Sequence, residues 1–438
     1  MPQAGTGTAT PLPRGRTLGG GSAINGMVFA RGHRSSYDAW VAAGATGWGF
    51  ADLLPYFMRS ENAVGHVSTI RGADGPLTVG PPRPPHPVLA ALLQAAAEAG
   101  HPLATDISGG SEEGFGWTDL NIVDGRRQSA ADAYLTPAQG HTNLDIVTDA
   151  LVHRLHLRSG RCTGVEYRVE GTSVSVDCSG EVVLTAGSIG SPQLLMLSGI
   201  GPPSHLRDLG LEVVADLPGV GSNLQDHPVA TLVYRASRPV PTGANGHGEV
   251  VGLLRSRPGL DGPDLQLIFV DATSFVPSGD LPDQGYTIGV ALMRPHSRGT
   301  VRLASIEPGA PPLLDPNYVG DDRDLTAMVS GLRLARKIGQ ADAIASWRDG
   351  EIQPGSGIED DIGLRDYVRR TLASYMHPVG TCRIGTDEEA VVDPELRVPG
   401  ISGLRVADAS VMPSIISANT NATVYAIAER AAAIIKAA

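Results

Sequence analysis

A glycine-rich turn near the start of the chain is the first place where the residue types could support chemistry. The turn reads Gly19-Gly20-Gly21-Ser22 and is followed by Asn25-Gly26. Glycine has no Cβ, so three in succession allow the backbone to approach a ligand closely. Amide groups at the start of a following helix would suit a phosphate or another electron-rich group. Taken alone, such a run is more often an ordinary turn, so its meaning depends on the surrounding sequence.

Histidine is the side chain best suited to accept a proton at neutral pH, because its ordinary pKa is about 6.5. The chain contains 12 histidines, and most histidines in proteins have surface or packing roles. His205 and His227 are interpreted in this way, as residues that cap or buttress structure. The three cysteines include no C-x-x-C pair, so no metal site is predicted, and Cys382 is interpreted as a buried packing residue.

Composition limits the classes of protein to which the chain could belong. Its 438 residues carry a formal net charge of −12, which gives no electrostatic reason to bind nucleic acid or an anionic membrane. Hydrophobic residues make up 42% and charged residues 18%, as in a folded globular protein. No apolar run is long enough for a membrane span, and residues 1–16 lack the apolar core of a secretory signal. The cysteine content predicts a reducing compartment, the cytoplasm.

Two regions far apart in the sequence show the pattern of parallel α/β structure. Residues 181–187 read as a strand that runs into a glycine turn, and a helix is predicted from about 191 to 199. Residues 404–408 predict a second strand. The alanine-rich segment from about 421 to 436 predicts a long helix near the C-terminus.

The middle of the chain shows a different pattern. Short β-rich segments separated by Pro, Gly and Asp predict an antiparallel sheet that forms a separate layer. These segments are 231–237, 250–256, 265–271, 286–293 and 299–305. A helix is predicted after them, around 324–338. The expected architecture is a discontinuous α/β domain with a β-rich domain inserted into it.

Several segments resemble the signatures of the glucose–methanol–choline (GMC) oxidoreductases. The first is PRGRTLGGGSAINGMVFAR (13–31), which continues to Trp40, and the second is TAGSIGSPQLLMLSGIGP (185–202). The other matching segments are 124–138, 217–228, 376–385 and 406–432. The resemblance extends over about residues 11–435. The C-terminal segment is similar to choline dehydrogenases, which favours a dehydrogenase.

This resemblance implies a fold and a reaction. The fold is an α/β FAD-binding Rossmann-like domain, N-terminally incomplete, with an inserted antiparallel-sheet substrate domain. The expected boundaries are 1–225 for the flavin module, 226–375 for the substrate domain and 376–438 for the returning active-site segment. The reaction is oxidation of the CH–OH group of a small-molecule alcohol. The resemblance makes His377 the catalytic base and Asn419 its partner, a position where many relatives have His.

The resemblance also assigns residues to the cofactor, FAD. The backbone of Val152 is expected near the adenine, Asp408 near cofactor hydroxyls, and the helix start at Thr420 and Asn421 near the flavin ring. The full set of expected contacts is Gly19, Gly20, Ser22, Asn25, Gly26, Val152, Ala186, Asp408, Ala409, Thr420 and Asn421. Some family members bind FAD covalently through a His that corresponds to Ile24, so the FAD here is expected to be non-covalent.

One family feature is missing from the sequence. No G-x-G-x-x-G turn occurs, although the family carries one in a βαβ unit before the first signature. We therefore expect a chain that begins partway through its cofactor domain and binds FAD poorly. Two alternatives stay open: a truncated, cofactor-free and inactive paralogue, and a hydroxynitrile lyase on the same scaffold. The sequence does not identify the alcohol, nor whether oxygen or a quinone-like carrier accepts the electrons.

Overall fold

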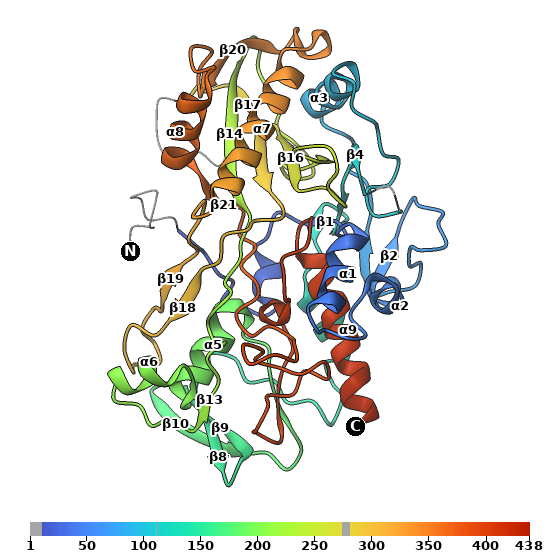
Figure 1. Cartoon of the computed structure of the whole chain (residues 1–438). Helices are drawn as coiled ribbons and strands as arrows, with labels where there is room; N and C mark the ends of the chain where they lie inside the picture. The colour runs from blue at the N-terminus through green and yellow to red at the C-terminus, as the bar shows by residue number, and fades with distance from the viewer. Residues whose placement is uncertain (1–10, 111, 274–280) are drawn as a thin grey trace.

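The computed structural model describes residues 11–110, 112–273 and 281–438. A large antiparallel sheet with three helices forms the upper part of the molecule in Figure 1, and smaller sheets with α5 and α9 form the lower part. The first ten residues lie outside the described part. The expectation of no secretory signal and the start of the predicted unit 1–225 both fall on them.

The large sheet contains seven strands in the order β20-β14-β17-β16-β15-β4, with the short strand β21 also paired to β14. Every pairing in it is antiparallel. The strands are β4 (Gly114–Trp117), β14 (Pro228–Ala236), β15 (Val250–Leu254), β16 (Leu265–Val270), β17 (Gly285–Leu292), β20 (Arg348–Gln353) and β21 (Ala373–Ser374). The four segments predicted between 231 and 293 are therefore confirmed as strands of one antiparallel sheet.

The two faces of this sheet differ in composition, because successive side chains of a strand point to opposite sides. One face packs against α3 (Pro87–Glu98), α7 (Asp322–Gly339) and α8 (Asp361–Thr371). It carries the aromatic side chains Phe115, Tyr234, Phe269 and Tyr286. The other face packs against the lower part of the molecule and is aliphatic, with Val229, Val251, Leu253, Ile268, Val270 and Ala291.

The lower part contains a parallel pair, β11 (Val182–Leu184) with β22 (Leu404–Val406). Helix α5 (Gly187–Leu197) follows β11 directly, so it begins earlier than predicted and contains Pro192 in its interior. Proline has no N–H to donate to the carbonyl four residues earlier. That carbonyl, of Ser188, accepts a hydrogen bond from Thr381 Oγ1 at 2.6 Å instead. A bond from another segment therefore satisfies the group that proline leaves free.

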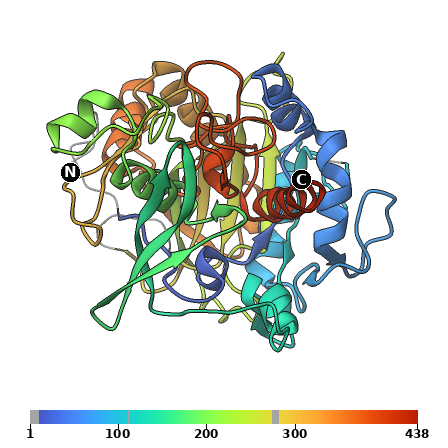
Figure 2. The same ribbon diagram turned by 90° about the horizontal axis from the view of Figure 1, so that it is seen from below.

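The lower part also contains a three-stranded sheet, in which β8 (Leu151–Arg158) pairs with β9 (Arg161–Val169) and β9 pairs with β10 (Thr172–Asp177). One further strand prediction needs correction. Residues 299–305 do not join the large sheet, because β18 (Thr300–Arg302) pairs with β19 (Leu313–Asp315). In Figure 2 the C-terminal helix α9 (Asn421–Ala437) is seen nearly end-on.

The remaining elements include two helices, α1 and α2, and a set of shorter strands and turns around these layers. They are η1 (Gly20–Ala23), β1 (Val28–Phe29), α1 (Arg34–Ala42), α2 (Phe50–Ser60), β2 (Glu61–Ala63), β3 (Leu77–Val79), β5 (Asp119–Leu120), β6 (Ile122–Val123), β7 (Arg126–Arg127), η2 (Ala131–Leu135), α4 (Thr136–Ala138), β12 (Ile200–Gly201), α6 (Pro203–Asp208), β13 (Ala215–Asp216), η3 (Asp342–Ile344) and η4 (Ala409–Val411). Among the described residues, no helix combines the length and apolarity needed to cross a membrane.

Candidate active site

The backbone around His377 is held by one buried carboxylate. Met376 has a φ of 68°, a left-handed conformation that costs energy for a non-glycine residue and often marks a functional site. Asp226 Oδ1 accepts hydrogen bonds from the backbone N–H of His377 at 2.7 Å and of His227 at 2.8 Å. Its Oδ2 accepts from Ser374 Oγ and from the hydroxyl of Tyr318. Asp226 therefore fixes two histidines against each other, one immediately before β14 and one in the segment after β21.

The side chains of these two histidines lie in contact. His377 Nδ1 is 2.9 Å from His227 Nδ1, and the two rings are nearly perpendicular. On its other side, His377 Nε2 is 3.4 Å from Asn419 Nδ2. Tyr375 packs edge-on against the His377 ring, with 4.6 Å between the ring centroids. The structure thus brings together His377 and Asn419, which the sequence predicted as partners.

Asn419 is positioned from the substrate-domain sheet. Gln266, on β16, donates through Nε2 to Asn419 Oδ1 at 3.3 Å. Both residues are buried, and Gln266 Oε1 has no hydrogen-bond partner among the described residues. An amide orientated in this way presents Nδ2 towards His377. The site therefore lies where the aliphatic face of the sheet meets the segment before α9.

Burial governs the protonation of both histidines. His227 is fully buried, which lowers its pKa well below the usual value; the neighbouring His377 lowers it further, and nearby backbone carbonyls partly oppose this. Burial also lowers the pKa of His377, a residue that is half-buried by its exposed surface. Both imidazoles are therefore neutral at pH 7. A neutral imidazole can accept a proton.

The first glycine signature is joined directly to the segment that carries Asn419. Ser36 Oγ donates to Ser417 Oγ at 3.1 Å, and the hydroxyls of Tyr37 and Thr423 are 2.8 Å apart. Trp40 Nε1 donates to the carbonyl of Ser414 at 2.8 Å. Residues 36–40 and 414–423, which are almost 400 positions apart in the sequence, are therefore joined on one side of the site.

The glycine turn itself has the conformation that glycine permits. Gly19 and Gly20 have φ values of 88° and 53°, and a Cβ added at Gly20, Gly21 or Gly26 would meet no atom within 4 Å. The helix expected immediately after the turn is only the short 3-10 turn η1, and α1 begins later, at Arg34.

Two polar residues of this signature connect it to the segment 124–138. Ser22 Oγ donates to the carbonyl of Gly19 at 2.6 Å and accepts from the N–H of Ala130 at 2.9 Å. Asn25 Oδ1 accepts from Arg127 Nη1 at 2.5 Å. These bonds hold the turn in place, so its backbone forms a fixed surface.

The other residues predicted to bind the cofactor lie around the start of α5 and on β8. Ala186 is the N-cap residue of α5, and Ala409 begins η4. Asp408 accepts hydrogen bonds from the N–H of Gly187 at 2.9 Å and from Ser191 Oγ at 2.5 Å, so its observed contacts join α5 to η4. Val152 lies on β8 with 37% of its surface exposed. Their contacts with a cofactor stay predictions.

Comparison with known proteins identifies the family. Models of the GMC oxidoreductase family match residues 4–229 and 295–428. The human mitochondrial choline dehydrogenase is 42% identical over 97% of this chain and 76% of its own length. The chain belongs to the GMC oxidoreductase family. It is accordingly an FAD-dependent oxidoreductase that acts on the CH–OH group of an alcohol, as the sequence predicted.

Other similarities of this GMC oxidoreductase support the same assignment. The oxygen-dependent choline dehydrogenase of Rhizobium etli is 40% identical over 96% of this chain and 81% of its own length. The structure of pyridoxine 4-oxidase from Mesorbium loti superimposes with a TM-score of 0.94 at 36% identity, over 99% of this chain and 86% of that one. The expected fold class, a flavin domain with an antiparallel substrate sheet, is confirmed.

Several groups in this GMC oxidoreductase fit FAD. Among the described residues, Ser188 Oγ at the start of α5 and Asn421 Nδ2 at the start of α9 are buried without a hydrogen-bond partner. Thr420, the N-cap residue of α9, makes no side-chain capping bond in this part of the chain, so amides in the first turn of α9 are available to an electron-rich group. These unpaired groups lie at two of the places that the sequence assigned to the cofactor.

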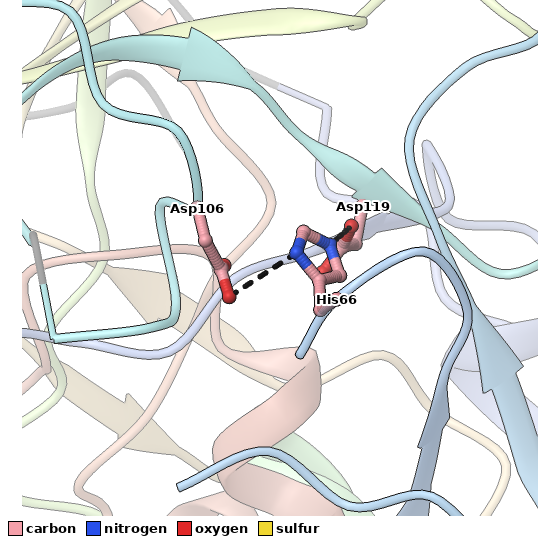
Figure 3. A group of neighbouring side chains, drawn as sticks. All are labelled: His66, Asp106 and Asp119. Atoms are coloured by element: carbon pink, nitrogen blue, oxygen red, sulfur yellow. Dashed lines mark hydrogen bonds and ion pairs between the residues drawn. The ribbon is translucent and has the colours of Figure 1, made fainter. Parts of the chain in front are cut away.

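A second buried cluster surrounds Arg71, away from the glycine turn. Figure 3 shows His66 between Asp106 and Asp119, with Nε2 2.7 Å from Asp119 Oδ1 and Nδ1 3.3 Å from Asp106 Oδ2. The three residues could in principle hold a metal ion. However, Arg71 already pairs with both aspartates at 2.6 Å and with Glu61 at 2.8 Å. The cluster is therefore an ion-pair network.

Sequence reasoning missed two residues of the site. His227 was interpreted as a structural buttress, yet it contacts the predicted base directly. Gln266 was read only as part of a strand. The segment LPGVGSNLQDHP (217–228) was recognised as family-like, which was the available signal for His227. His205 does serve as a buttress, because its Nε2 accepts from the N–H of Leu303 at 3.1 Å.

Proposed function

We propose that His377 and Asn419 are the catalytic pair of this alcohol-oxidising enzyme. The observation that carries the proposal is the neutral imidazole of His377, whose Nε2 faces an amide donor, Asn419 Nδ2, at 3.4 Å. A hydroxyl group placed beside these two nitrogens, within hydrogen-bond reach of each, would be held by both. Asn419 Nδ2 would donate to the alcohol oxygen, and His377 Nε2 would accept the hydroxyl proton.

The proposed reaction balances as a two-electron oxidation. The O–H proton passes to His377 Nε2, the C–H bond breaks with its electron pair as hydride, and the C–O bond becomes a carbonyl. FAD, when bound, supplies the acceptor for that hydride. Asn419 holds the developing oxyanion by its hydrogen bond, and Gln266 keeps the amide turned towards it. Asn419 cannot act as a base, so the proton has one destination.

We propose that FAD is bound without a covalent bond. Ile24 stands where some relatives have a covalently linked histidine, and its side chain is 51% exposed with no nucleophilic atom. The groups proposed to hold FAD are the glycine-turn backbone, Ser188, Asn421 and the first-turn amides of α9. Acid precipitation of the flavin-loaded protein checks this, because it denatures the protein and releases a non-covalent flavin into the supernatant. Flavin that stays in the protein pellet would contradict the proposal.

The substrate is proposed to be a small primary alcohol, on the similarity to two enzymes named for choline and one named for pyridoxine. The electron acceptor is left to experiment, with oxygen and a quinone-like carrier as the two candidates. A cytoplasmic location is proposed on the strength of three free thiols, Cys162, Cys178 and Cys382, although one relative is named as mitochondrial.

One experiment tests the proposal. The purified chain is mixed with FAD and gel-filtered, and retained flavin is exposed without oxygen to choline, pyridoxine and benzyl alcohol. The assignment is supported if an alcohol bleaches the flavin band of the wild type and fails to bleach that of His377→Gln, in which flavin is still bound. Bleaching by an alcohol at the same rate in His377→Gln would exclude His377 as the base. Retained flavin that no alcohol bleaches would argue against the proposed substrate class.

A further inference from the structure

His227 lies behind the proposed base and offers it a single hydrogen-bonding pattern. Its Nε2 is 3.1 Å from the carbonyl oxygen of Ile416. A carbonyl accepts hydrogen bonds and cannot donate, so His227 Nε2 carries the hydrogen. In a neutral imidazole only one nitrogen carries hydrogen, so His227 Nδ1 is left with a lone pair. That lone pair faces His377 Nδ1 at 2.9 Å.

We propose that His227 is a positioning residue that sets the tautomer of the base, so that His377 carries its hydrogen on Nδ1 and keeps the Nε2 lone pair for the substrate. Only the kinetic consequence of this arrangement rests on the proposed function. The two facing Nδ1 atoms cannot both carry a hydrogen in that contact, because the two hydrogens would collide. The Ile416 carbonyl decides which one does.

The same direction of hydrogen bonding continues on the far side of His377. Gln266 Nε2 donates to Asn419 Oδ1, so Asn419 Nδ2 points to His377 Nε2 as a donor. A hydrogen on His377 Nε2 would meet that donor, whereas a lone pair accepts it. The contacts from Gln266 and from Ile416 therefore select the same tautomer from opposite ends. Only this tautomer can accept a proton from an alcohol held at Asn419.

Two substitutions at His227 separate hydrogen bonding from packing. His227→Gln keeps a donor for the Ile416 carbonyl and an acceptor for His377 Nδ1–H, while His227→Leu keeps a similar volume and neither polar group. We expect kcat/KM of the FAD-loaded enzyme to fall about tenfold or more in His227→Leu, with KM little changed, and to recover most of the loss in His227→Gln. His205→Leu is the matched control, because it removes another histidine hydrogen bond, one made to Leu303 and not to a residue of the proposed site.

The decisive readout is independent of turnover. In the full chain labelled with 15N-histidine, long-range 15N–1H coupling patterns distinguish the two neutral tautomers, and His377→Gln and His227→Gln assign the signals by loss. We expect hydrogen on Nδ1 in His377 and on Nε2 in His227. Wild-type His377 with its hydrogen on Nε2 would overturn the proposal, as would an unchanged tautomer and rate in His227→Leu. Correct tautomers without alcohol oxidation would instead count against the proposed function alone.

Discussion

Two side-chain clusters in this molecule each contain histidine and treat it in opposite ways. Around Arg71, the side chains of Glu61, Asp106 and Asp119 are paired with guanidinium groups or with His66. Around His377, the groups that contact the imidazole are neutral, namely a second histidine, an amide and a tyrosine ring. The carboxylate of Asp226 bonds to the backbone N–H of His377 and not to its ring. In the first cluster every charge has a partner. In the second, the contact found for His377 Nε2 among the described residues is the amide of Asn419 at 3.4 Å.

The pKa shifts of the histidines follow from this difference. The hydrogen bond to Asp119 raises the pKa of His66, whereas burial lowers the pKa of His227 and of His377. Three carboxylates and two guanidinium groups, those of Arg31 and Arg71, leave room for one more positive charge, which a protonated His66 supplies. A network of paired charges thus serves stability, and a neutral, half-buried imidazole is available for chemistry.

The largest expected effect is on the rate, at His377. Replacing it with Gln removes the base, and general-base catalysis contributes about 10²–10⁴-fold. We expect kcat/KM to fall by about that factor while the free energy of unfolding changes little, since Gln fills much of the same space. Stopped-flow flavin reduction and urea unfolding measure the two quantities. If His377→Gln reduced flavin as fast as the wild type, the His377 cluster would have no catalytic role to set it apart from the Arg71 cluster.

At Arg71 we expect the opposite result, a loss of stability with little change in rate. Arg71→Met leaves Glu61, Asp106 and Asp119 buried without their shared partner, and breaking a buried ion pair in this way costs about 3–5 kcal/mol. The free energy of unfolding should fall by about that amount, with the rate of the remaining folded, flavin-loaded fraction nearly unchanged. The surface variant Arg370→Met, which removes the exposed pair with Asp366, is the control and should cost at most about 1 kcal/mol.

A smaller loss of rate is expected at Asn419. Asn419→Leu removes the donor proposed for the alcohol oxygen, and a hydrogen bond to a charged group contributes about 1.5–3 kcal/mol, or about 10–150-fold in rate. Asn419→His, which restores a donor, should recover part of the loss. Rates equal to wild type in Asn419→Leu would show that the substrate oxygen is held elsewhere.

The sequence predicted those parts of the molecule whose pattern is local. The helix α9 and strands β14–β17 follow from alanine-rich and β-rich segments that their neighbours reinforce. The start of α5 was predicted several residues late, because Pro192 reads as a first-turn residue when the compensating Thr381 hydroxyl, far away in sequence, is unknown.

The predicted pair His377 and Asn419 came from family motifs, and the structure brings the two together. The Arg71 cluster could not be predicted, since its members are spread from Glu61 to Asp119 with no shared motif. The contact of His227 with His377 depends on how β14 meets the segment after β21, which no local pattern records.

The smallest expected effect is the pH dependence of stability, and its sign distinguishes the two clusters. His66 has a raised pKa in the folded state, so its contribution is fully present below about pH 6.5, the unfolded value, and is lost as pH rises through the folded pKa. His227 has a lowered pKa, so its contribution is present above about pH 6.5 and is lost as pH falls towards the folded pKa.

Urea unfolding between pH 5.5 and 8 of wild type, His66→Gln and His227→Gln tests these signs. The destabilisation caused by His66→Gln should be larger at pH 5.5 than at pH 8, because the charged imidazole that it removes is present at low pH. The destabilisation caused by His227→Gln should be larger at pH 8, because below about pH 6.5 the wild-type protein also loses stability as its unfolded histidine takes up a proton. If both differences changed in the same direction with pH, the two clusters would not be opposites, and the neutrality required of the proposed base would lose its physical support.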